Sequence, residues 1–573
     1  MKLRLLLITV FVCQYAVGQE LSNISKSPLL QINGGLSVNQ TFNWSDVPGS
    51  YRQPYAYTVM ANLNFSVYGW SVPLSGMFSN RQWSYQQPFN QFSLNPSYKW
   101  IKIYLGYNSM AFSSYTLNGH RFYGGGVELT PNGNWKFSAM AGRMQERVLP
   151  DSAGRIEPAY YRFGTGVKTE YSFKGGNVAL STFYAKDDKN SLAGYDSLKI
   201  TPAENLSLGL STNFSLFSHV NVGLEYSTSL FTEDLRLPSA EGQYPLMPVF
   251  KKRSSTHQYQ ALKSNFAYNS PFGSIGAGYE RVEPGYRTLG SYSTVNDFEN
   301  YTLNYSGQII PEKLNFAANI GLQKDDLQNN KAQNNKRTVG SANVGFTPIQ
   351  ALNISLNYGN FRNYTHVRSG FENINNTTPY QYADTLDYTQ ISETFGAAVS
   401  ITPKGNENVR RSIILSANYQ KASDQQSDNT AHSNNNFFNG MIGYSQSMVK
   451  QNLSLNSGFN FNHSSADSIV SIMLGPSLSA RKSFFDKKFN TNLSVAYNQN
   501  IMNSKAQSEV YILRAGIGYV LKEAHNFDFS AVLANRHNMI KSSRTKDVAI
   551  TFTYRYNFKG VKVDLKKKAE PKQ

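Results

Sequence analysis

Residues 548–558, Val-Ala-Ile-Thr-Phe-Thr-Tyr-Arg-Tyr-Asn-Phe, decide the fold class because apolar and polar side chains alternate through nearly all of them. One face carries Val548, Ile550, Phe552, Tyr554, Tyr556 and Phe558, and the other carries Ala549, Thr551, Thr553, Arg555 and Asn557. Extended chain places successive side chains on opposite faces. This two-residue period therefore predicts a β-strand with one apolar and one wettable face.

The same alternation recurs from about residue 30 to residue 559. Two further clear cases are the stretches 206–216 and 489–501, where Leu, Val, Phe and Tyr occupy alternate positions. Segments of about 10 to 14 residues are separated by Asn, Gly, Ser, Asp or Pro, which favour turns. No stretch beyond the N-terminus has a convincing helical period, so the sequence predicts an all-β protein.

Strand length separates the two all-β architectures that use many alternating strands. Soluble strands usually have about five or six residues, whereas a tilted strand needs about 9–11 to cross a bilayer. The polar face carries Ser, Thr, Asn, Gln and Gly and offers little for a second packed layer. We therefore expect a closed antiparallel transmembrane β-barrel. A long secreted sandwich or adhesin is the alternative.

Connection lengths predict the sidedness of this barrel and its strand number. Short connections such as 175–176, 271–273 and 311–312 alternate with long polar ones at 109–119, 146–158, 188–202, 231–254, 324–336, 364–387 and 423–435. Outer-membrane barrels have short periplasmic turns and longer extracellular loops. Unbroken alternation requires a tight turn at Asn95-Pro96-Ser97 and gives 26 strands, plus or minus 2.

Composition excludes several protein classes. Charged residues are 16% and aromatic residues 13% of the 573 residues, which argues against disorder. Lys2 and Arg4, followed by an apolar run and Ala16-Val17-Gly18, predict a cleaved signal peptide over residues 1–18. The single cysteine, Cys13, lies within it, so we expect no disulfide and no thiolate metal site in the mature chain.

The predicted domain organisation follows from these boundaries. Residues 19–29 form a short periplasmic segment, residues 30–559 the barrel, and residues 560–573 a basic disordered periplasmic tail that contains Lys566-Lys567-Lys568. Strand periodicity begins near Leu30, so no N-terminal plug domain is expected. Because so wide a barrel cannot fill its lumen with inward side chains, we expect its own loops or a protein partner to occupy it.

Two groups of motifs resemble a known family. They are Arg281-Val282-Glu283-Pro284-Gly285-Tyr286-Arg287, with Leu289-Gly290-Ser291-Tyr292 and Asn296-Asp297-Phe298-Glu299-Asn300, and Tyr98-Lys99-Trp100, with Gly119-His120 and Gly124-Gly125-Gly126-Val127-Glu128. These resemble stretches of uncharacterised outer-membrane β-barrel proteins of Bacteroidota. The resemblance implies an outer-membrane location and a barrel fold, and it implies no activity.

Two sets of charged residues are candidate interaction sites. Arg281, Glu283, Arg287, Asp297 and Glu299 are predicted to clamp an extracellular loop, with a solvated surface turn as the alternative. Lys251, Lys252 and Arg253 end one of the two longest connections in this pattern and are candidate contacts for lipopolysaccharide phosphates. The net charge of +18 is compatible with an anionic neighbour, and export of the barrel argues against a nucleic-acid partner.

No catalytic, cofactor-binding or metal site is predicted. The eight histidines are scattered without metal-ligand spacing, and Asp187-Asp188 and Asp325-Asp326 are more typical of hairpin surface than of divalent-ion sites. A barrel hydrolase would need a histidine beside a serine or an acid at the rim, and the sequence shows no such set.

The leading functional hypothesis is a passive conduit, or the membrane component of a transport or secretion assembly. In this hypothesis the barrel is not an enzyme, and removal of loop 231–254 is expected to raise its conductance. The alternative is a non-conducting outer-membrane scaffold that holds partner proteins through its loops or lumen.

Overall fold

The computed structural model describes most of the region in which strands are predicted. The described residues are 30–46, 53–80, 91–150, 158–192, 200–217, 219–242, 250–325, 327–328, 336–364, 389–405, 408–424, 434–466 and 469–563. The predicted signal peptide, the segment 19–29 and residues 564–573 lie outside them. No helix among the described residues is long and apolar enough to cross a membrane.

Twenty-seven strand segments form one sheet. The first fourteen are β1 (Leu30–Ser45), β2 (Tyr55–Val67), β3 (Trp70–Ser79), β4 (Gln91–Leu94), β5 (Ser97–Tyr98), β6 (Ile101–Ala111), β7 (Asn118–Leu129), β8 (Trp135–Gln145), β9 (Arg162–Phe173), β10 (Gly176–Asp187), β11 (Glu204–Leu216), β12 (Val220–Thr232), β13 (Thr256–Ser270) and β14 (Gly273–Val282). The others are β15 (Phe298–Ile310), β16 (Leu314–Asp325), β17 (Lys336–Ile349), β18 (Leu352–Tyr364), β19 (Thr389–Ile401), β20 (Val409–Asp424), β21 (Asn434–Met448), β22 (Leu453–Ala466), β23 (Ile469–Phe484), β24 (Phe489–Met502), β25 (Lys505–Leu521), β26 (His525–Asn538) and β27 (Ser543–Val563).

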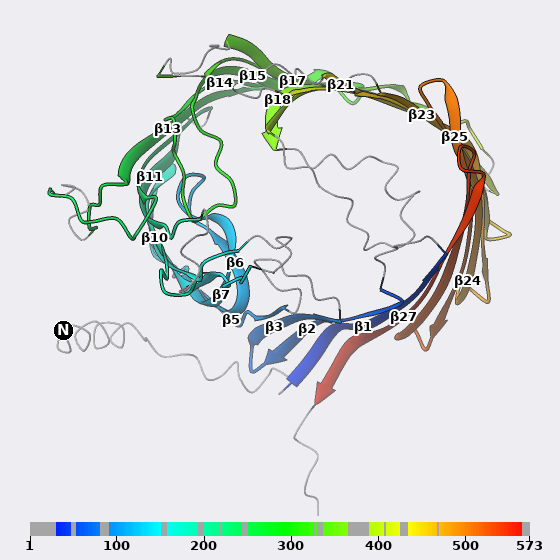
Figure 1. Ribbon diagram of the computed structural model, residues 1–573, viewed down its shortest axis with the longest axis horizontal. Helices are drawn as coiled ribbons and strands as arrows, with labels where there is room; N and C mark the ends of the chain where they lie inside the picture. The colour runs from blue at the N-terminus through cyan, green and yellow to red at the C-terminus, as the bar shows by residue number, and fades with distance from the viewer. Residues whose placement is uncertain are drawn as a thin grey trace, which may run out of the picture.

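The sheet closes on itself. Each strand pairs antiparallel with its sequence neighbours, and β1 pairs with β27 over residues 30–45, which completes the ring seen in Figure 1. Segments β4 and β5 both lie between β3 and β6, so they are parts of a single barrel strand. The molecule is therefore a closed barrel of 26 antiparallel strands, as the sequence predicts.

The predicted turn at Asn95-Pro96-Ser97 is wrong, although the strand count is right. The register against β6 is the same before and after this point, with Ser93 opposite Gly106 and Ser97 opposite Lys102. Pro96 lacks an N–H donor, so it interrupts the hydrogen-bond ladder without reversing the chain. The chain reverses instead at Lys99, whose φ is 50°.

The last strand extends beyond the aromatic residue at which the sequence places its end. β27 continues from Phe558 to Val563, so the tail predicted from residue 560 begins within a strand. Two residues of β27, Lys559 and Gly560, lie opposite the single residue Asn33 of β1. This β-bulge, with Gly560 at a φ of 56°, lets the pairing resume after the extra residue.

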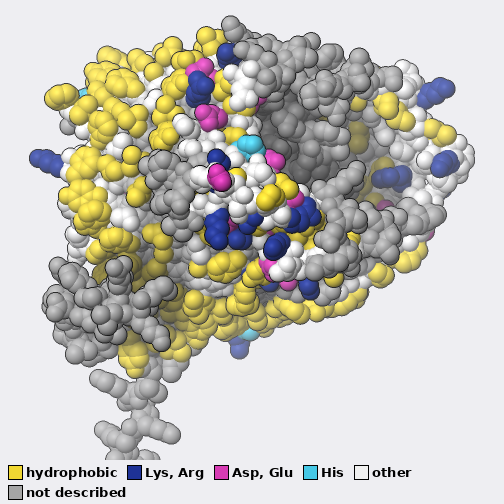
Figure 2. All heavy atoms as spheres, turned by 60° about the vertical axis from the view of Figure 1, so that its left-hand side comes forward, with side chains coloured by type: hydrophobic (Ala, Val, Ile, Leu, Met, Phe, Trp, Pro, Cys, Tyr) yellow, Lys and Arg dark blue, Asp and Glu magenta, His cyan; other side chains and the backbone are white. Residues whose placement is uncertain are grey.

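The two faces of the wall differ as the alternation predicts. Residues that share the register of Val548 to Phe558 point outward and include exposed Phe42, Leu210, Leu513 and Phe529. The opposite face, toward the lumen, carries Ser, Thr, Asn and Gly. Figure 2 shows hydrophobic side chains over much of the outer surface in view. A wall with an apolar outer face and a polar lumen is suited to spanning a bilayer.

Aromatic side chains gather on this outer face near both edges of the barrel. At one edge the rings of Phe42 and Tyr55 lie 5.0 Å apart, and at the other Trp70 stacks on Tyr98 at 5.2 Å. Such belts place amphipathic rings at the headgroup level. The two belts therefore mark the edges of the membrane-spanning band.

Connections on the two edges differ in length, which fixes the orientation. At the edge that we assign to the periplasm, connections have two to seven residues. At the opposite edge they reach 24 residues, and only those between β22 and β27 are as short as two to four. The predicted alternation of short and long connections therefore holds through β21 and not beyond it.

Candidate functional site: the lumen

Two extracellular connections fold into the lumen and narrow it. They are residues 112–117, between β6 and β7, and residues 283–297, between β14 and β15, and we call them the luminal loop pair. They contact each other and the inward face of β6 to β15. Figure 1 shows the loop that follows β14 crossing the inside of the ring toward β6.

Buried apolar residues hold the luminal loop pair to the wall. Tyr286 is fully buried, and its ring meets that of Tyr115 edge-on at 6.0 Å. The Tyr286 hydroxyl donates a hydrogen bond of 2.7 Å to the backbone oxygen of Tyr115. Leu117 and Leu289 join a second cluster with inward Phe122 and Phe183 of the wall. This part of the lumen is thus a packed apolar core. The sequence predicts a polar inner face throughout, so it does not predict this core.

Asn205 of β11 is the polar anchor of the longer loop. Its side chain is fully buried and uses both ends of the amide. The amide nitrogen donates to the Ser229 hydroxyl at 2.7 Å, and the amide oxygen accepts from the Leu289 N–H at 3.1 Å. Thr288 donates to the same oxygen at 3.1 Å. Because both the donor and the acceptor of this buried amide are hydrogen-bonded, it fixes Thr288 and Leu289 of the loop against the wall.

The five charged residues predicted to clamp this loop do not form one cluster. Arg281 and Glu299 face outward and lie 3.9 Å apart across β14 and β15. Glu283 accepts a hydrogen bond from the Gln260 backbone at 2.7 Å, and Asp297 accepts one from Leu327 at 2.9 Å. Arg287 pairs with Glu233 inside the lumen, 4.0 Å above the Phe231 ring. The five residues therefore act at four separate points, and Tyr286, Thr288 and Leu289 hold the loop.

The connection between β12 and β13 has described residues on both sides of the wall, because Glu233 pairs with Arg287 in the lumen whereas Phe250 lies outside. Phe250 packs on Leu230 in a cluster with Tyr184 and Leu206. These wall residues belong to the outward register of exposed Leu180 and Leu210, so Phe250 covers the outer face. The expectation that removal of loop 231–254 raises the conductance stays a prediction, since Phe231 and Glu233 face the lumen and Phe250 covers the outer face.

Lys251, Lys252 and Arg253 lie beside this outer cluster, near the extracellular edge. Arg253 donates to the Leu237 backbone oxygen at 2.8 Å, and its Nε is buried without a partner among the described residues. Arg253 also lines a recess of about 550 Å³ together with outward Phe163, Lys186 and Lys189. Basic side chains gather next to the hydrophobic surface on this side of the barrel (Figure 2).

The inward charges of β6 to β14 are paired locally. Lys102 lies 3.9 Å from Glu128, and Lys263 lies 3.7 Å from Glu280. Further inward pairs are Lys136–Glu170 at 3.0 Å, Lys168–Glu170 at 3.9 Å and Arg162–Asp187 at 2.7 Å. This half of the lumen wall thus combines the luminal loop pair with mutually neutralised charges.

The described residues show no constellation for covalent or metal chemistry. No group of three or more His, Cys, Asp or Glu residues in the described ranges could hold a metal ion. Asp187 is occupied by Arg162 and by the Ala203 N–H, and Asp188 accepts from the Asn190 N–H. Of the histidines that the structure describes, none is hydrogen-bonded to a serine or an acid, and His120 bonds to the Arg121 backbone oxygen.

Sequence reasoning missed Tyr286, Leu289 and Asn205 as the residues that narrow the lumen. Apolar Tyr286 and Leu289 within a polar connection are a signal that could have found the loop. Asn205 carries no such signal because Asn recurs at inward positions throughout the barrel, for example at Asn213 and Asn221.

Comparison with known proteins shows similarity in fold. No family model and no curated protein matches this sequence. Among solved structures, the Escherichia coli P pilus tip assembly intermediate PapC-PapD-PapK-PapG aligns at 11% identity and a TM-score of 0.43, over 93% of this chain and 62% of the other. The ferric preacinetobactin receptor BauA from Acinetobacter baumannii aligns at 10% identity and a TM-score of 0.36, over 91% and 80%. Acinetobacter baumannii OccAB2 aligns at 9% and 0.28, over 68% and 99%.

These alignments are too distant to carry an argument about activity. This chain spans less than two thirds of the length of the pilus assembly chain that it matches. Its function therefore has to be argued from its own lumen and surface.

Proposed function

We propose that this protein is a passive outer-membrane conduit, acting alone or as the membrane component of a transport or secretion assembly. The role needs no covalent chemistry and no cofactor. The polar lumen solvates the cargo, and the luminal loop pair restricts access from the extracellular side.

One observation carries this proposal. The luminal loop pair contacts the wall from β6 to β15, and no described segment lies against the inward face of β20 to β27. That face is lined with Ser, Asn, Thr and Gly, which water wets readily. Among the described residues the lumen is thus narrowed from one side, and the wall on the other side is polar, which suits a conduit better than a sealed scaffold.

We also propose that the outer face near β10 to β13 binds anionic lipid. Lys251, Lys252 and Arg253 lie beside apolar wall at the extracellular edge, where lipopolysaccharide phosphates would meet them. Arginine and lysine form charge-assisted hydrogen bonds with phosphate. A protein partner that engages the open side of the lumen is compatible with the same architecture.

The conduit proposal is tested by single-channel recording in planar bilayers. Residues 286–295 are replaced by a short Gly-Ser linker, which leaves the pair Val282 and Phe298 of β14 and β15 in place. Removing this loop empties one side of the lumen, so the unit conductance is expected to rise severalfold. The matched control shortens the outer connection at residues 240–250, and its conductance is expected to equal that of the wild type.

The control distinguishes a lumen effect from a general loss of stability. Equal increases in both loop variants would contradict the assignment of residues 283–297 as the restriction. A wild type and a loop variant that are both silent, although folded in the bilayer, would support the non-conducting scaffold instead.

A further inference from the structure

Five arginines face the lumen from β20 to β27. The pairing register fixes their side: Arg514 lies opposite Val532, and Val532 lies opposite Ala549, whose neighbours Val548 and Ile550 point outward. The same register assigns four further arginines to the inner face, namely Arg410, Arg481, Arg536 and Arg555.

Inward carboxylates are few on this half of the wall. Away from the strand ends, those described on β20 to β27 are Asp528 and Asp547. Asp528 pairs with Arg555 at 2.7 Å, and Asp547 accepts a hydrogen bond from Ser45. On β6 to β14, by contrast, inward carboxylates accompany the inward Lys and Arg residues, as in Lys102–Glu128 and Lys263–Glu280. Among the described strand residues, one side of the lumen wall is therefore neutral and the other is basic.

The arginines are spread from one edge of the barrel to the other. Arg536 lies two residues from the extracellular end of β26, and Arg514 lies in the middle of β25. Arg481 and Arg410 lie near the periplasmic ends of β23 and β20. An anion that moves down this wall would thus meet positive charge at every depth.

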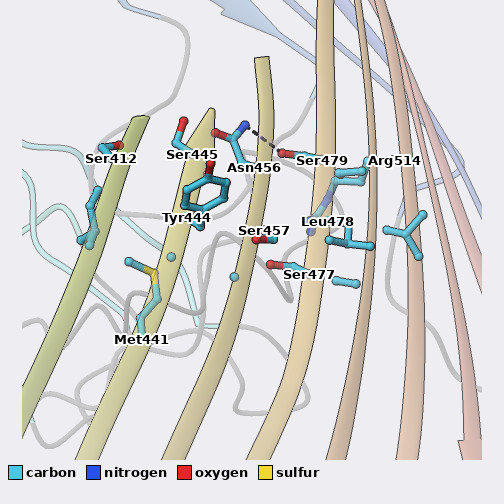
Figure 3. A pocket seen from close by; sticks show the side chains of 16 residues that line it. Ser412, Met441, Tyr444, Ser445, Asn456, Ser457, Ser477, Leu478, Ser479 and Arg514 are labelled. Atoms are coloured by element: carbon cyan, nitrogen blue, oxygen red, sulfur yellow. Dashed lines mark hydrogen bonds between the residues drawn. The ribbon is translucent and has the colours of Figure 1, made fainter. Parts of the chain in front are cut away.

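A hydrogen-bonding row accompanies the central arginine. Directly paired residues on six consecutive strands form it, in the order Ser412, Ser445, Asn456, Ser479, Ser494 and Arg514. Together they line a recess of about 350 Å³ on the inner wall (Figure 3). Asn456 donates to Ser479 at 3.1 Å within the row.

The neighbouring inward row repeats this arrangement one step toward the periplasm. It runs from Arg410 through Ser447 and Ser454 to Arg481 and Asn492. Adjacent strands lie about 4.8 Å apart, and Arg481 and Arg514 are two strands apart. A moving anion can therefore pass directly from one of these guanidinium groups to the other. Hydroxyl and amide donors between them can replace part of the hydration shell of an anion.

We infer that this basic wall makes the conduit selective for anions, with phosphate- or carboxylate-bearing solutes as its cargo class. The inference rests on the proposed function. Fixed arginines in a channel raise the local concentration of anions and repel cations, as rings of Arg or Lys do in anion pores. Arginine is the suitable residue because it keeps its charge at any physiological pH and binds oxyanions in a bidentate manner.

The test is the reversal potential of the full chain in planar bilayers under a tenfold KCl gradient. The wild type is expected to favour chloride over potassium severalfold. The triple variant Arg410→Gln, Arg481→Gln, Arg514→Gln is expected to lower that permeability ratio to near one with the unit conductance largely kept. The matched control is Arg411→Gln, because Arg411 is the next residue of β20 and points outward. Its ratio is expected to equal that of the wild type.

The outcomes separate this inference from the proposed function. A conducting wild type that favours potassium or discriminates neither ion would overturn the inference and leave the conduit intact. Selectivity that survives in the triple variant would overturn it as well. If the triple variant does not insert into the bilayer, the single variants Arg410→Gln and Arg481→Gln test the inference. Each is expected to lose part of the chloride selectivity. A folded wild type without conductance would overturn the conduit and the inference with it.

Discussion

Single buried side chains decide how the lumen is narrowed. Tyr286 and Tyr115 carry phenols that lie outside the strands, in the luminal loop pair. Burial raises the pKa of Tyr286 well above its ordinary range, and burial together with the nearby Glu280 carboxylate does the same for the pKa of Tyr115. Both phenols are therefore neutral at physiological pH.

This direction of shift predicts an alkaline release of the loop. The pKa of each phenol in the docked loop exceeds that of a free phenol, about 10. Docking is therefore fully stabilised below about pH 10 and weakens as the pH rises toward the pKa of the docked phenol. We expect the conductance to increase reversibly between about pH 10 and 11. Single-channel recording across this range measures it.

Phenylalanine variants provide the control for this titration. Tyr286→Phe removes the hydrogen bond to Tyr115, which costs about 1 kcal/mol of docking, and it removes one titrating group. Its alkaline rise in conductance is expected to be smaller than that of the wild type. Tyr268→Phe, on the outward face, should leave the rise unchanged. An identical response in all three proteins would contradict the docking role of Tyr286.

The roles of individual residues are the feature that the sequence predicts least well. It assigns the faces of the strands correctly, since alternation is a local property of each side chain. It does not find Asn205, whose role depends on a loop more than 70 residues away in sequence. It also groups Arg281 and Glu299 with luminal Arg287, whereas the strand register turns the first two outward.

At the scale of the element, the strands themselves are largely predictable and their irregularities are not. Pro96 is a turn signal in sequence, yet its ring tolerates the extended conformation and the chain passes through it. The aromatic residue Phe558 resembles a strand end, yet Gly560 permits a bulge and a further stretch of pairing. Both errors arise because the register of neighbouring strands overrides local turn preference.

The seam between β1 and β27 gives an element-scale prediction. Gly34, beside the bulge, has a φ of 118°, and a Cβ placed on it would lie 2.1 Å from the backbone oxygen of Asn62. Gly34→Ala is therefore expected to strain the pairing of β1 with β2, next to the seam, and to destabilise the barrel by roughly 1–3 kcal/mol. The temperature at which the folded band converts to the unfolded band in detergent electrophoresis should fall.

Gly76→Ala is the matched control for the seam. Gly76 faces outward on β3, and the nearest atom to an added Cβ is 3.9 Å away. Its conversion temperature is expected to match that of the wild type. A Gly34→Ala variant as heat-resistant as the control would show that the seam relaxes without cost.

At the scale of the whole molecule, two-sided strands and an even strand count suffice to predict a closed barrel. The direction in which each long connection folds is not predictable from composition, since residues 233–255 and 283–297 are both polar with a few apolar residues. Which way they turn depends on the wall that each one meets, apolar Leu206 and Leu230 outside or Phe122 and Phe183 inside.

The outward connection predicts retained anionic lipid. Purification of the triple variant Lys251→Gln, Lys252→Gln, Arg253→Gln in mild detergent is expected to yield severalfold less lipopolysaccharide per barrel than the wild type, measured as bound phosphate. The control removes Lys482, an outward lysine near the opposite edge, as Lys482→Gln. Equal phosphate in the wild type and the triple variant would contradict this contact.

The central claim is that one continuous wall separates lipid from a water-filled lumen, and cysteine labelling along β27 tests it most directly. In a Cys13→Ser background, single cysteines at residues 548–557 are exposed in liposomes to a membrane-impermeant maleimide. The account predicts fast labelling at Thr551, Thr553 and Asn557 and protection at Val548, Ile550 and Phe552. Uniform labelling of both sets, or protection of both, would contradict it.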